Sequence, residues 1–107
     1  LCLIIDNNKF QNEISVEDTL GNITFEEKLK SFGWDYISID GHSISDIDSA
    51  LNNLNNAKAP LAIDAHTIKG KGVDFMENNN SWHSKILDED NYKSAIRQCE
   101  KALNEIN

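Results

Sequence analysis

The sequence predicts an α/β fold in which a parallel sheet and the helices on either side of it form three layers. Segments typical of strands and helices alternate along the chain, in the order strand, helix, strand, helix, strand, helix. The first of them, Leu1–Ile5, is continuously apolar, as expected for a strand that is buried on both faces of a parallel sheet. Right-handed crossovers would connect such strands, and ligands would bind beyond their carboxyl ends.

The first half of the chain contains one strand and one helix of this pattern. The strand ends in the polar turn Asp6-Asn7-Asn8, and the mixed, polar residues 9–23 are expected to form a loop. Thr24 can cap a helix together with Glu27, and Gly33 would end that helix.

The second half continues the alternation. Residues 34–39 are rich in β-forming types and predict a second strand. Ser43 or Ser45 can cap the helix that follows, and residues 61–66 predict a third strand. A final helix is expected over residues 88–105, with acidic residues in its first turn. Its apolar residues share one face, which is expected to pack: Tyr92, Ile96, Cys99, Leu103 and Ile106.

Composition limits the classes of protein and partner. A chain of 107 residues is one domain at most. Its net charge of -8 would repel the phosphates of nucleic acids and the surface of an anionic membrane, so neither is expected as a partner. The longest apolar run is too short to span a membrane and no signal segment opens the chain, which favours a cytoplasmic location. Because Leu1 falls directly into a strand, we expect the chain to be part of a larger domain.

Two loops carry residues that could bind an anion. Lys69-Gly70-Lys71-Gly72 follows the third strand, and glycines allow close approach of a ligand to the backbone while lysines neutralise its charge. Taken alone, the motif also fits a solvated turn. Further along, Trp82 and His83 place an aromatic ring beside an imidazole in an Asn-rich loop, which strengthens the interpretation as a binding site.

The polar turn Asp6-Asn7-Asn8 allows two interpretations. Asn and Asp favour turns for local reasons, so the segment could simply reverse the chain. An Asn side-chain oxygen and a nearby backbone carbonyl would equally suit Mg²⁺, which prefers oxygen ligands.

Read in order, these segments resemble the N-terminal, cofactor-binding region of transketolases. The resemblance extends over nearly the whole chain and is most specific between Lys69 and His83. The matching motifs are Ile5-Asp6-Asn7-Asn8, Phe32-Gly33-Trp34, Ile39-Asp40-Gly41-His42, Ala65 to Val73, Phe75-Met76-Glu77-Asn78-Asn79 and Trp82-His83. The resemblance implies that residues 1–107 are the later part of the diphosphate-binding domain in a thiamine-diphosphate-binding fold.

The resemblance also implies roles for four residues. The Asn8 side chain and the Phe10 carbonyl would bind the Mg²⁺ or Ca²⁺ ion that holds the diphosphate of thiamine diphosphate. Lys69 would lie close to the cofactor. His83 would contact the diphosphate and the bound sugar, and would act in catalysis by stabilising charge or relaying a proton.

The implied reaction is transfer of a two-carbon ketol unit between sugar phosphates. The Gly-Asp-Gly turn that supplies a further cation ligand in the family does not occur in this chain, and neither does the pyrimidine-binding domain. A pyrimidine-binding domain or partner subunit would therefore complete the site, in a dimer or larger assembly.

Three residues qualify the resemblance. Ser84 replaces a usual Gly after the Trp-His pair, and Asp64 occupies a strand position that is mostly apolar in similar chains, so its carboxylate would need a partner. His42 is expected to be structural. Two other functions stay open, namely another thiamine-diphosphate enzyme such as a deoxyxylulose-phosphate synthase, or a non-catalytic α/β module that binds a partner.

Overall fold

The computed structural model describes residues 1–11, 14–15, 17 and 24–106. The chain divides into two compact units, one comprising residues 1–9 and 15–67 and the other residues 10–14 and 68–107. We describe each unit by itself.

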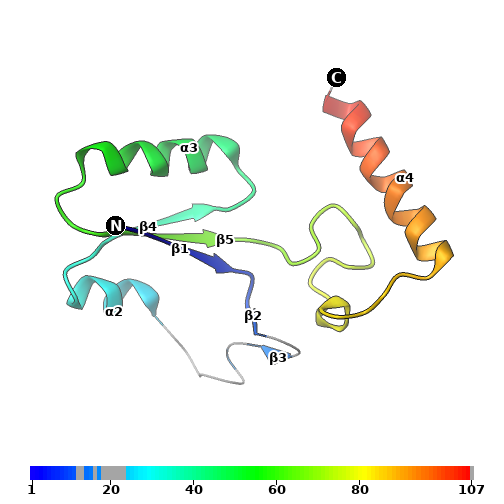
Figure 1. The fold of residues 1–107 in the computed structure, drawn as a ribbon, viewed down its shortest axis with the longest axis horizontal. Helices are drawn as coiled ribbons and strands as arrows, with labels where there is room; N and C mark the ends of the chain where they lie inside the picture. The colour runs from blue at the N-terminus through cyan, green and yellow to red at the C-terminus, as the bar shows by residue number, and fades with distance from the viewer. Residues whose placement is uncertain (12–13, 16, 18–23, 107) are drawn as a thin grey trace. The chain divides into compact units, whose positions relative to one another are not determined.

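The first unit is built on a three-stranded parallel sheet (Figure 1). Its strands are β1 (Cys2–Asn7), β4 (Asp35–Asp40) and β5 (Leu61–His66), in the spatial order β1-β5-β4. The strand in the middle of this order, β5, is buried from Leu61 through Ala65, since strands cover both of its edges and Ala50 packs with Leu61 and Ile63. The predicted parallel strands are thus confirmed. The expectation that the first strand is buried on both faces is wrong, because Leu3 and Ile4 are 38% and 62% exposed in β1, which stands at the end of the strand order.

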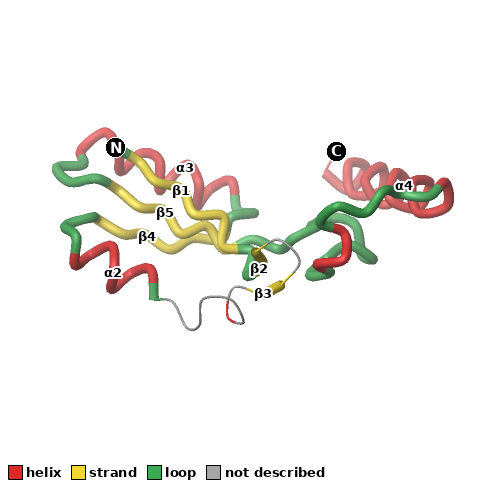
Figure 2. The backbone as a smooth tube through the Cα atoms, turned by 60° about the horizontal axis from the view of Figure 1, so that its bottom comes forward, coloured by secondary structure: helices red, strands yellow, loops and turns green. Residues whose placement is uncertain are grey.

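Helices cover both faces of this sheet, which gives the three predicted layers (Figures 1 and 2). On one face lies α3 (Ile44–Asn52), which continues as a short 3₁₀ turn, η1 (Asn53–Asn56), and on the other lies α2 (Phe25–Ser31). Apolar residues from β5 and α3 form the core, among them Ala50, Leu61 and Ile63. Ser43 is the residue that caps α3, because its side chain accepts a hydrogen bond from the Asp46 N–H.

Helix α2 begins after Thr24, as expected, but the capping interaction differs from the expected one. The Thr24 hydroxyl donates to the Glu27 carboxylate at 2.9 Å and accepts no bond from the helix backbone. Of the range expected to be a loop, residues 10–11 and 14–15 instead pair as two short strands, β2 (Phe10–Gln11) and β3 (Ile14–Ser15). Residues 12–13, 16 and 18–23 of that range lie outside the described residues.

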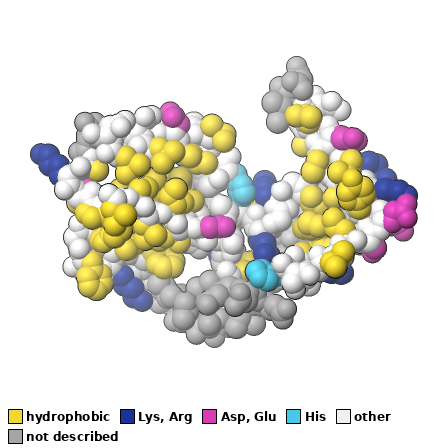
Figure 3. All heavy atoms as spheres, in the orientation of Figure 1, with side chains coloured by type: hydrophobic (Ala, Val, Ile, Leu, Met, Phe, Trp, Pro, Cys, Tyr) yellow, Lys and Arg dark blue, Asp and Glu magenta, His cyan; other side chains and the backbone are white. Residues whose placement is uncertain are grey.

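The second unit contains a long loop, a short 3₁₀ turn η2 (Asn80–Trp82) and the helix α4 (Glu89–Ile106). The expected packing face of α4 is largely exposed in the described structure (Figure 3), with Tyr92 55%, Ile96 40% and Leu103 61% accessible. Among the residues of this helix whose burial is described, Ala95 is the one that is buried. In the described part of the chain, no helix has the length and apolarity needed to cross a membrane.

Gly41, which follows β4, makes a close contact that leaves no room for a side chain. Its N–H donates to the His66 carbonyl at 2.8 Å, and a Cβ at this position would lie 2.6 Å from the Thr67 methyl carbon. We expect Gly41→Ala to destabilise the protein by about 1–3 kcal/mol because of this crowding, measured as a lower melting temperature of the full-length protein.

A second substitution provides the control for this prediction. Thr67→Ser removes the methyl group and keeps the hydroxyl, so that it should restore part of the stability lost in Gly41→Ala. An unchanged melting temperature in Gly41→Ala would contradict the prediction.

Candidate cofactor site

The carboxyl ends of the three parallel strands carry polar residues at one edge of the sheet. In the register of the sheet, His66 of β5 is level with Asn7 of β1 and Asp40 of β4. This edge is where ligands bind in open parallel sheets. The sequence prediction that the turn after β1 lies at such an edge is therefore confirmed.

The segment Asp6-Asn7-Asn8, predicted to be a turn, continues β1 through Asn7, so that the chain leaves the strand only at Asn8. Thr67, the first residue after β5, holds this segment. The Thr67 hydroxyl donates to the Asp6 carboxylate at 2.5 Å, and its N–H donates to the Asn7 carbonyl at 3.3 Å. The Asn8 amide nitrogen in turn lies 3.4 Å from the Asp6 carboxylate, a long hydrogen bond. Lys9 then adopts a left-handed conformation, with φ of 68°, which turns the chain toward Phe10.

The predicted cation ligands have the right donor chemistry. The Asn8 side-chain oxygen and the Phe10 carbonyl are hard oxygen donors of the kind that Mg²⁺ and Ca²⁺ prefer. Asn8 belongs to the first unit and Phe10 to the second. Within the described ranges, no group of three or more His, Cys, Asp or Glu side chains could hold a metal ion.

In the second unit, residues 69–83 form a loop closed by its own hydrogen bonds, which we call the 69–83 loop. The Lys69 carbonyl accepts from the Asn78 N–H at 2.9 Å, and the Gly72 N–H donates to the Glu77 carboxylate at 3.0 Å. Gly70 and Gly72 both have positive φ, 74° and 95°. A Cβ on Gly70 would lie 2.5 Å from the Met76 carbonyl oxygen, so the backbone packs closely on itself here.

The end of this loop fixes Trp82 and leaves His83 at the surface. The Asn79 side chain accepts from the N–H and the hydroxyl of Ser81, and the rings of Phe75 and Trp82 pack with centroids 5.2 Å apart. The Lys85 ammonium lies 4.3 Å from the Trp82 ring centroid, a cation–π contact. His83, one residue beyond this anchored ring, is exposed.

Two predicted residues, Lys69 and His83, are therefore brought into one hydrogen-bonded loop. Lys69 is half-buried, and its neighbour Lys71 is exposed, with its ammonium 3.8 Å from Glu77. The loop is tied to α4 by Gln98, whose side chain both accepts from the Asp74 N–H and donates to its carboxylate, each at 2.8 Å. Such a loop can present cationic and imidazole groups to an anion from a fixed backbone.

Asp64 forms a polar cluster that the sequence only partly indicated. Its carboxylate, 3% exposed, accepts from the Tyr36 hydroxyl at 2.5 Å and from the Asn7 amide at 3.3 Å, so the expected partners exist. The His66 Nε2 lies 3.7 Å from the same oxygen and 2.9 Å from the Ser38 hydroxyl. Alternation along strands places these residues on one face of the sheet, which was the available signal.

The protonation of Tyr36 follows from its surroundings. Burial, and then the hydrogen bond to Asp64, raise the pKa of the Tyr36 hydroxyl well above its ordinary value. The hydroxyl therefore remains a donor to the carboxylate at physiological pH.

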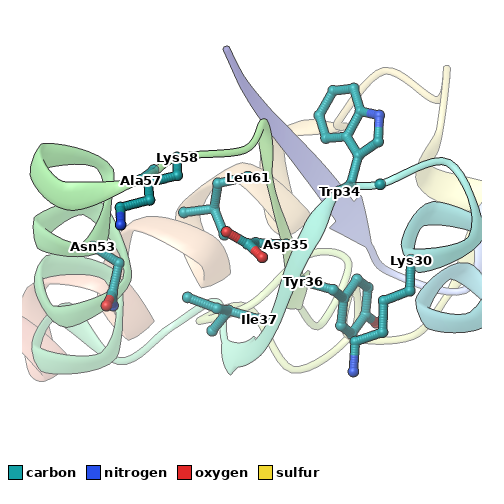
Figure 4. A pocket seen from close by; sticks show the side chains of 10 residues that line it. Lys30, Trp34, Asp35, Tyr36, Ile37, Asn53, Ala57, Lys58 and Leu61 are labelled. Carbon is teal, nitrogen blue, oxygen red and sulfur yellow. The ribbon is translucent and has the colours of Figure 1, made fainter.

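A cavity of about 800 Å³ lies at the other end of the strands, where no site was predicted (Figure 4). It is open near the start of β4 and β5, at the end of the sheet opposite Asn7 and Asn8. Its lining contains positively and negatively charged side chains and the indole of Trp34. The ammonium of Lys30, one of these charges, is paired with the Glu26 carboxylate at 2.7 Å. The side chains labelled in the figure are Lys30, Trp34, Asp35, Tyr36, Ile37, Asn53, Ala57, Lys58 and Leu61.

Comparison with known proteins agrees with the fold and with the order of the motifs. Residues 1–102 match the family model for the transketolase thiamine diphosphate binding domain. Over 91% of the chain, the structure is similar to part of the crystal structure of transketolase from Campylobacter jejuni, with a TM-score of 0.81 and 28% sequence identity. The match covers 15% of that protein.

The similar proteins include two named as transketolase subunits and one named as transketolase. The chain is 28% identical over 107 residues to one of the subunits of the apulose-4-phosphate transketolase of Phocaeicola vulgatus. It is 35% identical over 102 residues to the SqwG subunit of the 6-deoxy-6-sulfo-D-fructose transketolase of a Clostridium species. These alignments cover 99% and 94% of the chain. Human transketolase is 32% identical over 69% of the chain.

The chain spans only part of each of these relatives, 38% and 37% of the two subunits and 12% of human transketolase. The family assignment, in contrast, rests on nearly all of its own residues, because the family match runs from Leu1 to Ala102. From the parallel sheet, the motif order and these matches, we conclude that the chain belongs to the transketolase family, as part of its thiamine-diphosphate-binding domain.

Proposed function

We propose that residues 1–107 are the later part of the diphosphate-binding domain of a transketolase that transfers a two-carbon ketol unit between sugar phosphates. The observation that carries the proposal is the family match over residues 1–102, together with the Lys69–Gly72 and Trp82-His83 motifs on one closed loop. Thiamine diphosphate, when bound, supplies the nucleophilic carbon that attacks the donor ketose and keeps the two-carbon fragment.

In this proposal, residues of the chain bind and orient the cofactor's diphosphate. The Asn8 side chain and the Phe10 carbonyl are ligands of a Mg²⁺ or Ca²⁺ ion, since both are neutral oxygen donors that suit a hard cation. Lys69 places a positive charge near the diphosphate. Gly72 supports this role, because it has a φ of 95° and nothing within 4 Å of its Cβ position, which lets the backbone approach an anion closely.

His83 acts at the reacting end of the site. An imidazole can donate a hydrogen bond to a developing negative charge or move a proton at neutral pH. Its exposure in this chain, next to a firmly packed Trp82, supports a contact with both the diphosphate and a bound sugar phosphate. We therefore propose His83 as the catalytic residue.

In this proposal, a further domain or subunit supplies the remaining catalytic groups. We propose that a pyrimidine-binding domain or partner subunit completes the site in a dimer or larger assembly in the cytoplasm. Two similar proteins bear the names of transketolase subunits, which supports a divided enzyme. The exposed apolar residues of α4, which include Tyr92, Ile96 and Leu103, could pack against a partner in such an assembly.

Removal of the divalent cation tests the proposal directly. We expect the full-length protein, assembled with its pyrimidine-binding partner, to lose ketol transfer on treatment with a chelator, because the diphosphate is held through the cation. Added Mg²⁺ or Ca²⁺ together with thiamine diphosphate should restore the rate, measured as the release of the aldose product from a ketose phosphate donor.

The donor distinguishes the alternatives. Activity with pyruvate and none with ketose phosphates would replace the proposal by a synthase of the deoxyxylulose-phosphate type. An assembled protein that binds no thiamine diphosphate in calorimetry, with or without Mg²⁺, would contradict the proposal and support a non-catalytic binding module.

A further inference from the structure

We infer that Asp64 is a positioning residue for the turn that carries Asn8. Its buried carboxylate holds the side chain of Asn7, and through Asn7 it fixes the backbone from which Asn8 would reach the cation. The inference rests on the proposed function, because it concerns the affinity for the cation that Asn8 is proposed to bind.

The first argument is that the carboxylate of Asp64 is a poor choice for stability alone. It lies on the middle strand of the order β1-β5-β4 and is 3% exposed, and its Oδ1 atom has no hydrogen-bond partner among the described residues. Replacing buried charges by apolar residues of similar volume is often neutral or stabilising. The carboxylate is therefore better explained by the side chains that it holds in place, those of Asn7 and Tyr36.

The second argument is the direction of its two hydrogen bonds. Both reach the same oxygen, Oδ2, from opposite neighbouring strands. Tyr36 donates from the beginning of β4, whereas Asn7 donates from the last residue of β1. Of these two donors, Asn7 is the one that directly precedes Asn8 in the sequence. The two bonds can thus be separated by mutation.

The third argument is that the same turn is held from a second side. Thr67 donates to the Asn7 carbonyl and to the Asp6 carboxylate, and Asp6 lies within hydrogen-bond distance of the Asn8 amide. Asp64 and Thr67, which come from one strand and the residue after it, together fix the side chain and the backbone of Asn7. Groups that orient a metal ligand in this way commonly change metal affinity by about 10- to 100-fold when they are removed.

The test measures the binding of Mg²⁺ to the full-length protein, assembled with its pyrimidine-binding partner, at a fixed concentration of thiamine diphosphate. Calorimetry gives the affinity without relying on activity. Asp64→Leu and Asn7→Ala are each expected to weaken Mg²⁺ binding by about 10- to 100-fold. The double variant should be no weaker than the weaker single variant, because both remove the same interaction.

Tyr36→Phe is the matched control. It removes the other hydrogen bond to the same carboxylate oxygen, so it should lower the melting temperature and leave the Mg²⁺ affinity unchanged. Asp64→Asn retains an oxygen that can accept from Asn7, and it should recover most of the affinity lost in Asp64→Leu. If Asp64→Leu does not fold, the comparison of Asn7→Ala, Asp64→Asn and Tyr36→Phe still decides the result.

Two results would overturn the inference. One is an equal loss of Mg²⁺ affinity in Tyr36→Phe and Asn7→Ala, which would show a general effect of the sheet. The other is wild-type affinity in folded Asp64→Leu or in Asn7→Ala. Both leave the proposed function intact, because the wild-type protein still binds. Failure of the wild-type protein to bind Mg²⁺ with thiamine diphosphate would instead overturn the proposed function, and this inference with it.

Discussion

Replacing His83 by alanine is expected to lower the rate of ketol transfer by about 100- to 10,000-fold, the range typical of a lost general acid or base. The expected cause is local, because His83 is exposed. The described contacts that hold the 69–83 loop include backbone hydrogen bonds and the packing of Phe75 on Trp82, and they do not involve the His83 ring. The backbone N–H of His83 donates to the Asn80 carbonyl at 3.0 Å, and alanine retains that bond. The melting temperature should therefore remain unchanged.

The measurement is kcat and KM for the donor ketose phosphate in the assembled full-length protein. His42→Ala is the matched control, since His42 is a second exposed histidine but follows β4 in the Asp40-Gly41-His42 turn. The backbone N–H of His42 donates to Asp40, a bond that alanine also keeps. Wild-type kcat in His83→Ala, or an equal loss in both variants, would remove His83 from the proposed mechanism.

The parallel sheet could be predicted because its strands carry strong, local signals. Leu1–Ile5 and Leu61–Ala65 are apolar without interruption apart from Asp64. This pattern predicted two strands, but only β5 is buried as expected, whereas Leu3 and Ile4 of β1 are exposed. Both strands end in polar residues, and parallel pairing brings those ends to one edge regardless of details within the strands. The fold class and the location of Asn7 and Asn8 at the carboxyl end of β1 follow from these features alone.

Other features depend on contacts between distant residues and could not be read from the sequence. Asp64 receives hydrogen bonds from residues 57 and 28 positions away, and no local pattern identifies Asn7 and Tyr36 as its partners. The strands β2 and β3 have two residues each, which is too short for a periodic signal. The apolar stripe of α4 correctly predicted a helix, but a stripe does not say which surface will cover it.

The candidate site was predicted to different extents in its two parts. The 69–83 loop contains the glycines, lysines and Trp82-His83 pair that made the family recognisable, and the family match confirms that recognition. The roles of Asn8, Phe10, Lys69 and His83 remain predictions, because they concern a cation, a cofactor and a sugar. Chemistry of this kind follows from the arrangement of groups around a ligand, to which other parts of the protein contribute.

Replacing Gly70 by alanine is expected to have the largest effect on the structure of the 69–83 loop. The φ of 74° costs about 1–2 kcal/mol for a residue with a Cβ. The new Cβ would also lie 2.5 Å from the carbonyl oxygen and 2.7 Å from the carbonyl carbon of Met76. The Met76 carbonyl oxygen accepts from the Asn79 N–H at 3.1 Å, and the Met76 N–H donates to the Val73 carbonyl at 2.8 Å, so moving this peptide would break hydrogen bonds of the loop. Crowding of this kind adds about 1–3 kcal/mol.

Gly72→Ala separates the two causes. Gly72 has a φ of 95°, but a Cβ there would meet no atom within 4 Å. It should therefore show only the cost of the left-handed backbone, about 1–2 kcal/mol. The contrast between the two glycines measures the close approach of Gly70 to Met76 by itself.

Limited digestion with trypsin measures how far the 69–83 loop has opened. Opening of the loop in Gly70→Ala should expose the bonds after Lys69 and Lys71 to cleavage, detected by mass spectrometry of the assembled full-length protein. Gly72→Ala should be cut there more slowly than Gly70→Ala. If the loop is also the diphosphate contact that we propose, Gly70→Ala will lose affinity for thiamine diphosphate in proportion to the cleavage. Equal cleavage of both variants would instead show that backbone strain, and not the contact with Met76, determines the shape of the loop.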